Sequence, residues 1–120
     1  MGDDVVQSRL AQTELAAAAL VAIPIPIPCL CELVWVLSRG YRVSSAEIGR
    51  VLRDLAAARD VMLDRDAVTA GLSMLDAGGD FADGAIAAEG RRLGGEVFIS
   101  FDRQAVAMLN AQNAPARLLA

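Results

Sequence analysis

Histidine is absent from this sequence, and cysteine occurs only twice, at Cys29 and Cys31. Without an imidazole base, the nucleophilic schemes that pair serine or cysteine with histidine are excluded. The two cysteines form a lone C-x-C pair with no second pair of ligands, so we expect buried, reduced thiols rather than a structural zinc site. A metal site built from carboxylates is left open, and its hard oxygen ligands would suit Mg²⁺ or Mn²⁺.

Aromatic residues are also scarce, with three Phe, one Trp and one Tyr, although 55% of the 120 residues are hydrophobic. The core must therefore be built mainly from Ala, Leu, Val and Ile, and the composition excludes disorder. A chain of this length is expected to form one domain, residues 1–120, and to bury about two-thirds of its unfolded surface.

Membrane-spanning runs and targeting signals are lacking as well. Residues 15–31 carry no charge, but Pro24, Pro26 and Pro28 would break a helix there. The run is also shorter than the ~20 residues that cross a bilayer. With neither the basic region nor the cleavage pattern of a signal peptide, we expect a cytoplasmic protein without a membrane partner.

Helix-like and strand-like segments alternate along the chain. Apolar residues at helical spacing predict helices over about 4–20, 29–39, 44–59, 64–75, 80–93 and from Arg103 onward. Short apolar runs predict strands over 21–25, 60–63 and 96–100, and residues 116–120 are either a final edge strand or a frayed end. This alternation favours an α/β three-layer sandwich with a parallel sheet. In helix 44–59 the residues expected to face inward are Ile48, Val51, Leu52 and Leu55.

The stretch 78–103 places three aspartates at the ends of regular elements. Asp80 and Asp83 are neighbours on the first turn of helix 80–93. Asp102 follows the predicted buried strand EVFIS, at the sheet edge where the ligands of open α/β sheets collect. A bound divalent cation would relieve the repulsion between Asp80 and Asp83. The alternative is that these aspartates cap helices.

Glu32 is a carboxylate with apolar neighbours on nearly every side, in the run CLCELVWVL. It falls in the first turn of helix 29–39. Because glutamate is rarely buried without a partner, Glu32 is either exposed on the surface of that helix or an acid of a functional site.

The strings DFADGAIAAEGRRLGG and FISFDR resemble the C-terminal half of PIN-domain ribonucleases of the VapC toxin type. In that family an Asp-Ala-Leu-Ile-Ala-Ala helix start is followed by a strand and a Thr-Phe-Asp-Arg turn. Upstream, CELVWVLSRGYRVSSAEIGRVLRDL is similar to the family's Glu-bearing second helix, Tyr-containing turn and third helix. The resemblance covers about residues 3–110 and implies one PIN-like domain, an α/β/α sandwich of three layers around a parallel sheet.

The first central strand of that family, which ends in an aspartate of the acidic quartet, has no counterpart here. Residues 1–4 align with the segment that follows it, so we expect an N-terminally shortened domain. A start codon placed too far downstream, a truncation and a degenerate copy are three explanations. The two neighbouring strands would lose ladder partners unless another chain filled the gap, as a swapped or intimate homodimer would.

The activity that the resemblance implies is metal-dependent hydrolysis of RNA phosphodiesters by a toxin, with a small antitoxin protein as its partner. Glu32, Asp83 and Asp102 would be the catalytic acids that hold Mg²⁺ or Mn²⁺. Asp80 would be a supplementary metal ligand, and Ser100 would support a ligand carboxylate or a water through a hydrogen bond. The alternative is a PIN-fold remnant that has lost turnover and acts as a binding module.

Overall charge gives RNA binding little support. The formal net charge is −4 and the isoelectric point is about 4.7, so generic attraction to phosphate is weak. Contact with RNA would require metal ions together with local arginines such as Arg91, Arg92 and Arg103. The other role of these arginines, which the sequence favours, is solubility and salt bridging at a charged helix end.

Overall fold

The structure is a computed structural model that describes Arg9 and residues 23–119. Its elements are β1 (Ile23–Pro24), α2 (Ile27–Trp35), the π-helical turn η1 (Val36–Gly40), α3 (Ser45–Ala57), β2 (Val61–Met62), α4 (Arg65–Asp76), α5 (Phe81–Arg92), β3 (Phe98–Ser100), α6 (Arg103–Ala111) and β4 (Ala116–Leu118). The predictions from residue 23 onward are confirmed to within a few residues, and the C-terminal run forms a strand. The predicted helix 4–20 lies outside the described residues.

Short polar side chains fix where α3 and α4 begin. Ser44 Oγ accepts a hydrogen bond from the Glu47 N–H at 3.2 Å, and Asp64 Oδ1 accepts one from the Ala67 N–H at 3.0 Å. Helix α2 starts differently, directly after the Ile-Pro run, with proline in its first turn. Proline is tolerated there because the first amides of a helix have no intrahelical acceptor. Local sequence rules therefore place all three helix starts.

The strands of the described part pair in parallel, in two separate two-stranded sheets. β1 pairs with β2, with Ile23 opposite Val61, and β3 pairs with β4, with Ile99 opposite Arg117. Pro24 within β1 and Pro26 just after it keep the ladder short, because proline donates no hydrogen bond. The fold is thus mixed α/β with parallel pairing, as the alternation of elements indicated.

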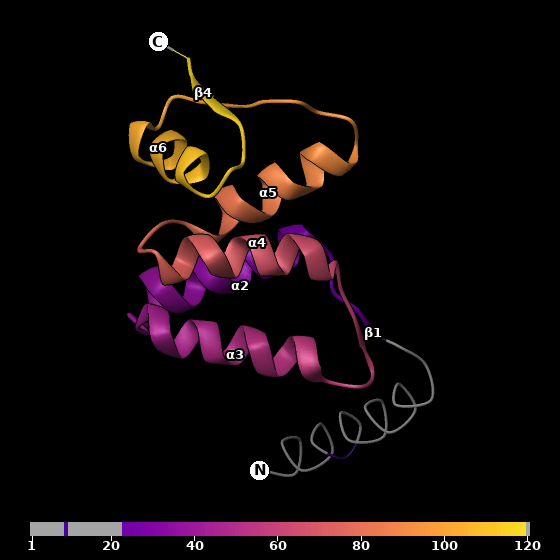
Figure 1. Cartoon of the computed structure of the whole chain (residues 1–120). Coiled ribbons are helices and arrows are strands. Elements are labelled where there is room, and N and C mark those ends of the chain that lie inside the picture. Colours follow the sequence, from indigo (N-terminus) through magenta and orange to yellow (C-terminus); the bar gives the residue numbers. More distant parts are fainter. Residues whose placement is uncertain (1–8, 10–22, 120) are drawn as a thin grey trace.

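The helices pack in a stack, with α3 at one end, α2 and α4 next, then α5, and α6 with β4 at the other end (Figure 1). A larger core lies between α2, α3, α4 and α5. Its fully buried large side chains are Leu30, Ile48, Leu52 and Phe81. A smaller core joins α4 and α5 to α6 and the two C-terminal strands, and its buried members are Met74, Ala87 and Leu109. None of the described helices is long and apolar enough to span a membrane.

Glycines allow α4 and α5 to approach each other closely. A Cβ atom added at Gly71 of α4 would come within 2.5 Å of two ring carbons of Phe81, and one added at Gly84 of α5 would collide with the carbonyl oxygen of Ala70. At the far end of α5, Arg92 forms an ion pair with the carboxylate of Asp64 at the start of α4. Helix α5, which carries two of the predicted site acids, is therefore fixed to α4 at both of its ends.

Two predicted burials on helices are wrong. Val51 was expected to face inward, but 42% of it is exposed, because the stripe that α3 buries follows Ile48 and Leu52 and leaves Val51 at its margin. Cys29 was expected to be buried and is exposed, since it lies off the face that α2 turns toward the core.

The prediction that strand 96–100 is buried is also wrong. Phe98 and Ser100 are half-buried, whereas Ile99 and the following Phe101 are 46% and 78% exposed. Successive side chains of a strand point to opposite faces, and only the face that holds Phe98 packs against the smaller core. The apolar composition of this strand therefore reflects one covered face, with the other open.

Candidate functional site

A cavity of about 890 Å³ opens where α2 ends and where α5 and α6 begin. The four acids singled out from the sequence all line it: Glu32 from α2, Asp80 and Asp83 from the start of α5, and Asp102 from the start of α6. These residues are far apart along the chain, so it is the packing of the three helices that brings them to one cavity. Ser100, the fifth predicted residue, is not part of the lining.

Asp80 and Asp102 are held at helix starts by backbone amides. Asp80 Oδ1 accepts a hydrogen bond from the Ala82 N–H at 2.9 Å. Asp102 Oδ1 accepts two, from the Gln104 N–H at 2.9 Å and from the Ala105 N–H at 3.2 Å. The capping alternative is thus confirmed for both aspartates. Within the described residues neither Oδ2 accepts a hydrogen bond, so one oxygen of each carboxylate stays available to a ligand.

Ser100 supports the backbone next to Asp102. Its Oγ accepts a hydrogen bond from the Asp102 N–H at 3.0 Å. The expected contact was with a carboxylate or a water. The hydroxyl stabilises the turn between β3 and α6 that presents Asp102 to the cavity, and donation of its O–H to a carboxylate or a water stays a prediction.

Asp83 occupies an electrostatically unfavourable position in the first turn of α5. It is half-buried, and burial raises the pKa of its carboxyl above the ordinary value, with the negative charges of Asp80 and Asp102 adding to the rise. Asp83 is therefore close enough to Asp80 and Asp102 to be affected by the negative charge of both. Glu32, the fourth acid, is exposed on α2, as one of its two sequence interpretations required.

Cys31 is a half-buried thiol in the wall of the same cavity. Burial raises the pKa of this thiol, and the carboxylates of Asp80 and Glu89 raise it further. A thiol in such surroundings stays protonated at neutral pH and is a poor nucleophile. Both cysteines are free, as expected of reduced thiols.

The described residues contain no group of three or more His, Cys, Asp and Glu side chains close enough together to hold a metal ion. The chemistry of the donors nevertheless fits, because carboxylate oxygens are the ligands that Mg²⁺ and Mn²⁺ prefer. Asp80 and Asp102 are kept at their positions by their cap hydrogen bonds, and Glu32 extends from a different helix. The fold gathers the acids around one cavity without bringing three of them close enough together to hold a metal ion.

Trp35, Arg39 and Gln104 also line the cavity, and the sequence alone did not single them out. The exposure of Trp35 could have been predicted from the apolar spacing of α2. The residues that this helix buries are three or four positions apart, and Trp35 lies outside that stripe.

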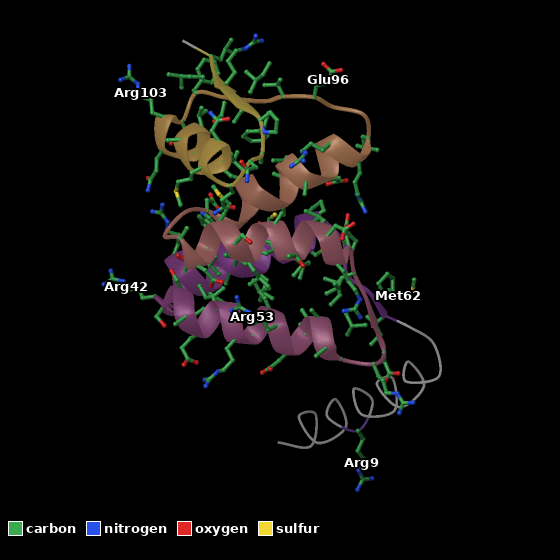
Figure 2. All side chains as sticks on the ribbon, viewed as in Figure 1. Arg9, Arg42, Arg53, Met62, Glu96 and Arg103 are labelled. Carbon is green, nitrogen blue, oxygen red and sulfur yellow. The ribbon has the colours of Figure 1, made fainter. Side chains whose placement is uncertain are left out.

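The three arginines that RNA contact was expected to require, Arg91, Arg92 and Arg103, do not line this cavity. Arg92 forms its ion pair with Asp64, as the salt-bridging interpretation predicted. Arg103 points away from the helices at the periphery of the molecule (Figure 2). Arg91 lines a different cavity. The arginine at the acidic cavity is Arg39.

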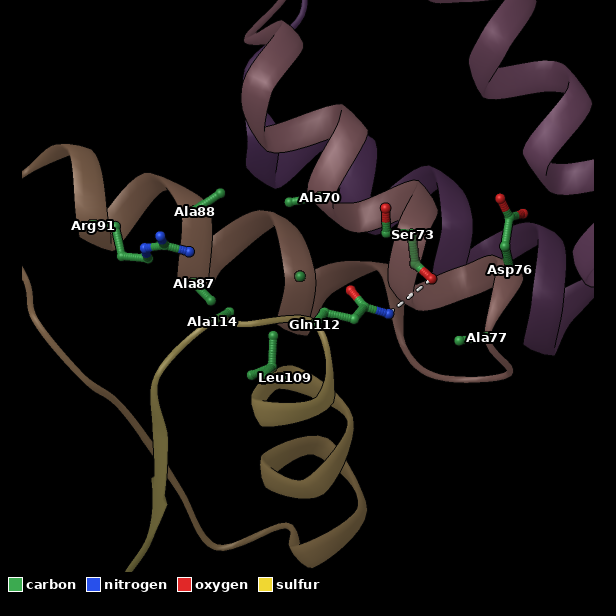
Figure 3. Close-up of a pocket in the computed structure, with 11 residues that line it drawn as sticks. Ala70, Ser73, Asp76, Ala77, Ala87, Ala88, Arg91, Leu109, Gln112 and Ala114 are labelled. Atoms are coloured by element: carbon green, nitrogen blue, oxygen red, sulfur yellow. Dashed lines mark hydrogen bonds between the residues drawn. The ribbon is translucent and has the colours of Figure 1, made fainter.

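A second cavity, of about 610 Å³, lies between α4, α5 and the end of α6 (Figure 3). Most of its lining is small: Ala70, Ala77, Gly84, Ala87, Ala88 and Ala114. Gln112 Nε2 donates a hydrogen bond to the Ser73 carbonyl oxygen at 3.2 Å, which ties α6 to α4 at its edge. Because no cluster of titratable groups converges on it, we assign no chemistry to this cavity.

The chain was compared with protein-family models, with curated proteins and with solved structures, and none of them matches it. Its function therefore has to follow from the cavity and its acids.

Proposed function

We propose that the protein is a metal-dependent endoribonuclease, similar to the VapC-type PIN-domain toxins, that hydrolyses RNA phosphodiesters at the acidic cavity. The observation that carries the proposal is that Glu32, Asp80, Asp83 and Asp102 reach one cavity from three separate helices. Burial raises the pKa of the Asp83 carboxyl, and the like charges of Asp80 and Asp102 raise it further, so Asp83 is held where its charged form is disfavoured. Perturbed acids in a cleft mark candidate functional sites.

In this proposal Asp83 and Asp102 are the principal metal ligands, with Glu32 as the third and Asp80 as a supplementary one. A bound Mg²⁺ or Mn²⁺ would lower the pKa of a water molecule and neutralise charge on the scissile phosphate. Asp80 and Asp102 would offer the Oδ2 atoms that their cap hydrogen bonds leave open. Those caps fix the two carboxylates in advance, so only Asp83 and Glu32 would have to adjust.

The PIN-like sandwich belongs to the same proposal. In this proposal β1–β2 and β3–β4 are the two outer pairs of one parallel sheet, and its central strand is not among the described residues. Parallel pairing within both sheets supports this, as do the exposed apolar residues Ile23 on β1 and Ile99 on β3. The exposed apolar side chains are also consistent with a homodimer or with an antitoxin that covers them.

A catalytically impaired binding module is the second candidate, and one observation favours it. No three acids of the described residues are close enough together to hold a metal ion. If Asp80 and Asp102 serve only to cap α5 and α6, the cavity would lack two of its metal ligands. It would then bind a partner without catalysing a reaction.

Cleavage of a single-stranded RNA in the presence of Mn²⁺ tests the first proposal against the second. We expect Asp83→Asn to lower the rate by at least ~100-fold, because a neutral amide is a poor metal ligand. Asp66→Asn is the matched control, since Asp66 is an exposed first-turn acid of α4 outside the cavity lining. Equal cleavage by the wild type and Asp83→Asn would overturn the assigned site. RNA binding by a wild type that does not cleave would favour the binding module.

A further inference from the structure

Trp35 is the single tryptophan of the chain, and 61% of it is exposed. It is the last residue of α2, a helix that buries Ile27, Leu30 and Val34 in the larger core. Among the described residues Tyr41 and Phe101 are exposed aromatic side chains as well. Trp35 is also part of the wall of the acidic cavity, so its exposed surface adjoins the site acids.

The wall next to Trp35 carries a cation. Ser38 and Arg39, on η1 directly after α2, line the cavity with it. Arg39 takes part in none of the ion pairs formed among the described residues, so its charge is not neutralised by a neighbouring acid. One wall thus offers a flat aromatic surface and a positive charge, and the starts of α5 and α6 offer carboxylates.

From this arrangement we propose that Trp35 is a stacking platform for a nucleobase of single-stranded RNA, with Arg39 beside it contacting a backbone phosphate. The inference rests on the proposed function, since it names how the nuclease would hold its substrate. At about 890 Å³ the cavity falls within the ~300–1,000 Å³ range of ligand sites.

Stacking resolves the difficulty that the net charge poses. A chain of net charge −4 repels RNA as a whole, and the site acids repel a phosphate until a cation is bound. Every base has an apolar π face, so an indole attracts RNA independently of charge and without strong sequence preference. Arg39 then supplies a local cation where the backbone passes.

Because Trp35 is the one tryptophan, its intrinsic fluorescence reports directly on the platform. We would titrate the wild type with a fluorescein-labelled, single-stranded oligoribonucleotide in EDTA, and follow both tryptophan emission and the anisotropy of the label. We expect saturable quenching of the emission that follows the anisotropy curve. Trp35→Ala should weaken binding about 5- to 150-fold, the range found when one stacking aromatic is removed.

Three further variants distinguish stacking from general apolar attraction. Trp35→Phe keeps an aromatic face and should bind within a few-fold of the wild type, whereas Trp35→Leu should bind as weakly as Trp35→Ala. Tyr41→Ala is the control, because Tyr41 is an exposed aromatic residue outside the cavity lining. Wild-type affinity in Trp35→Ala would overturn the inference. So would equal affinities of Trp35→Leu and the wild type, which would show that an apolar side chain suffices and that stacking does not contribute.

The inference and the proposed function can fail separately. If Trp35→Ala cleaves RNA with an unchanged KM, the stacking platform is refuted and the nuclease stands. If RNA quenches Trp35 but Asp83→Asn cleaves as fast as the wild type, the metal site is refuted and the platform stands.

Discussion

Gly71 of α4 lies against the ring of Phe81, the first residue of α5, so closely that a methyl group at Gly71 would stand 2.5 Å from two ring carbons. Phe81 is fully buried and directly follows Asp80. It belongs to the larger core and also lines the acidic cavity. The contact between Gly71 and Phe81 therefore fixes the position of the first turn of α5 against α4, and with it the position of Asp80 and Asp83.

Substituting Gly71 by alanine should destabilise the protein. The added methyl group would displace a buried ring, and overpacking of this kind costs about 1–3 kcal/mol. Gly90→Ala in α5 is the control, since a Cβ there meets nothing within 4 Å, and it should be neutral or stabilise by up to ~1 kcal/mol. Urea unfolding of both variants measures the difference, and equal midpoints would show that the contact between α4 and α5 is looser than described.

Asp83→Asn should stabilise the protein at neutral pH in the absence of metal. The pKa of the Asp83 carboxyl is raised in the folded state by burial and by Asp80 and Asp102, so folding favours its protonated form. The native state then binds more protons than the unfolded state, and the stability of the wild type falls as pH rises through this range. The advantage of Asp83→Asn should be full above the raised pKa and vanish below the ordinary value of about 3.9. Thermal unfolding of both proteins between pH 3 and 8 provides the measurement, and an advantage that persists at low pH would contradict this account.

Asp102 is expected to have two separable roles, a cap and a charge. Asp102→Ala removes both and should lower stability by about 0.5–2 kcal/mol, the cost of a lost N-cap. Asp102→Asn keeps an oxygen acceptor for the Gln104 and Ala105 amides and should be nearly as stable as the wild type. Both variants should lose RNA cleavage in Mn²⁺ if the charge binds metal. Wild-type cleavage by Asp102→Asn would leave Asp102 with its capping role alone.

The open face of β3 provides a test of the predicted homodimer. Val97, Ile99 and Phe101 are exposed along this strand, an apolar surface of the kind that a second chain would cover. We expect light scattering to give twice the monomer mass for the wild type and a monomer for Ile99→Lys. Leu93→Lys, at an exposed apolar residue just after α5, should leave the mass unchanged. A monomeric wild type would exclude the homodimer.

The sequence by itself determined the local features of this protein. Helix starts at Ser44, Asp80 and Asp102 could be predicted because a capping hydrogen bond joins residues only two or three positions apart. The spacing of apolar residues likewise predicted the helices and strands from residue 23 onward. Residue type and position were enough to predict Glu32, Asp80, Asp83 and Asp102 as candidate site residues.

Only the tertiary structure decided how those features meet. That Glu32, Asp83 and Asp102 share a cavity without forming a group that could hold a metal ion depends on how α2, α5 and α6 pack, and no local pattern encodes that packing. The same holds for the open face of β3 and for the exposure of Trp35. The apolar character of a side chain shows only that it can be buried, whereas the elements packed around it determine whether it is buried.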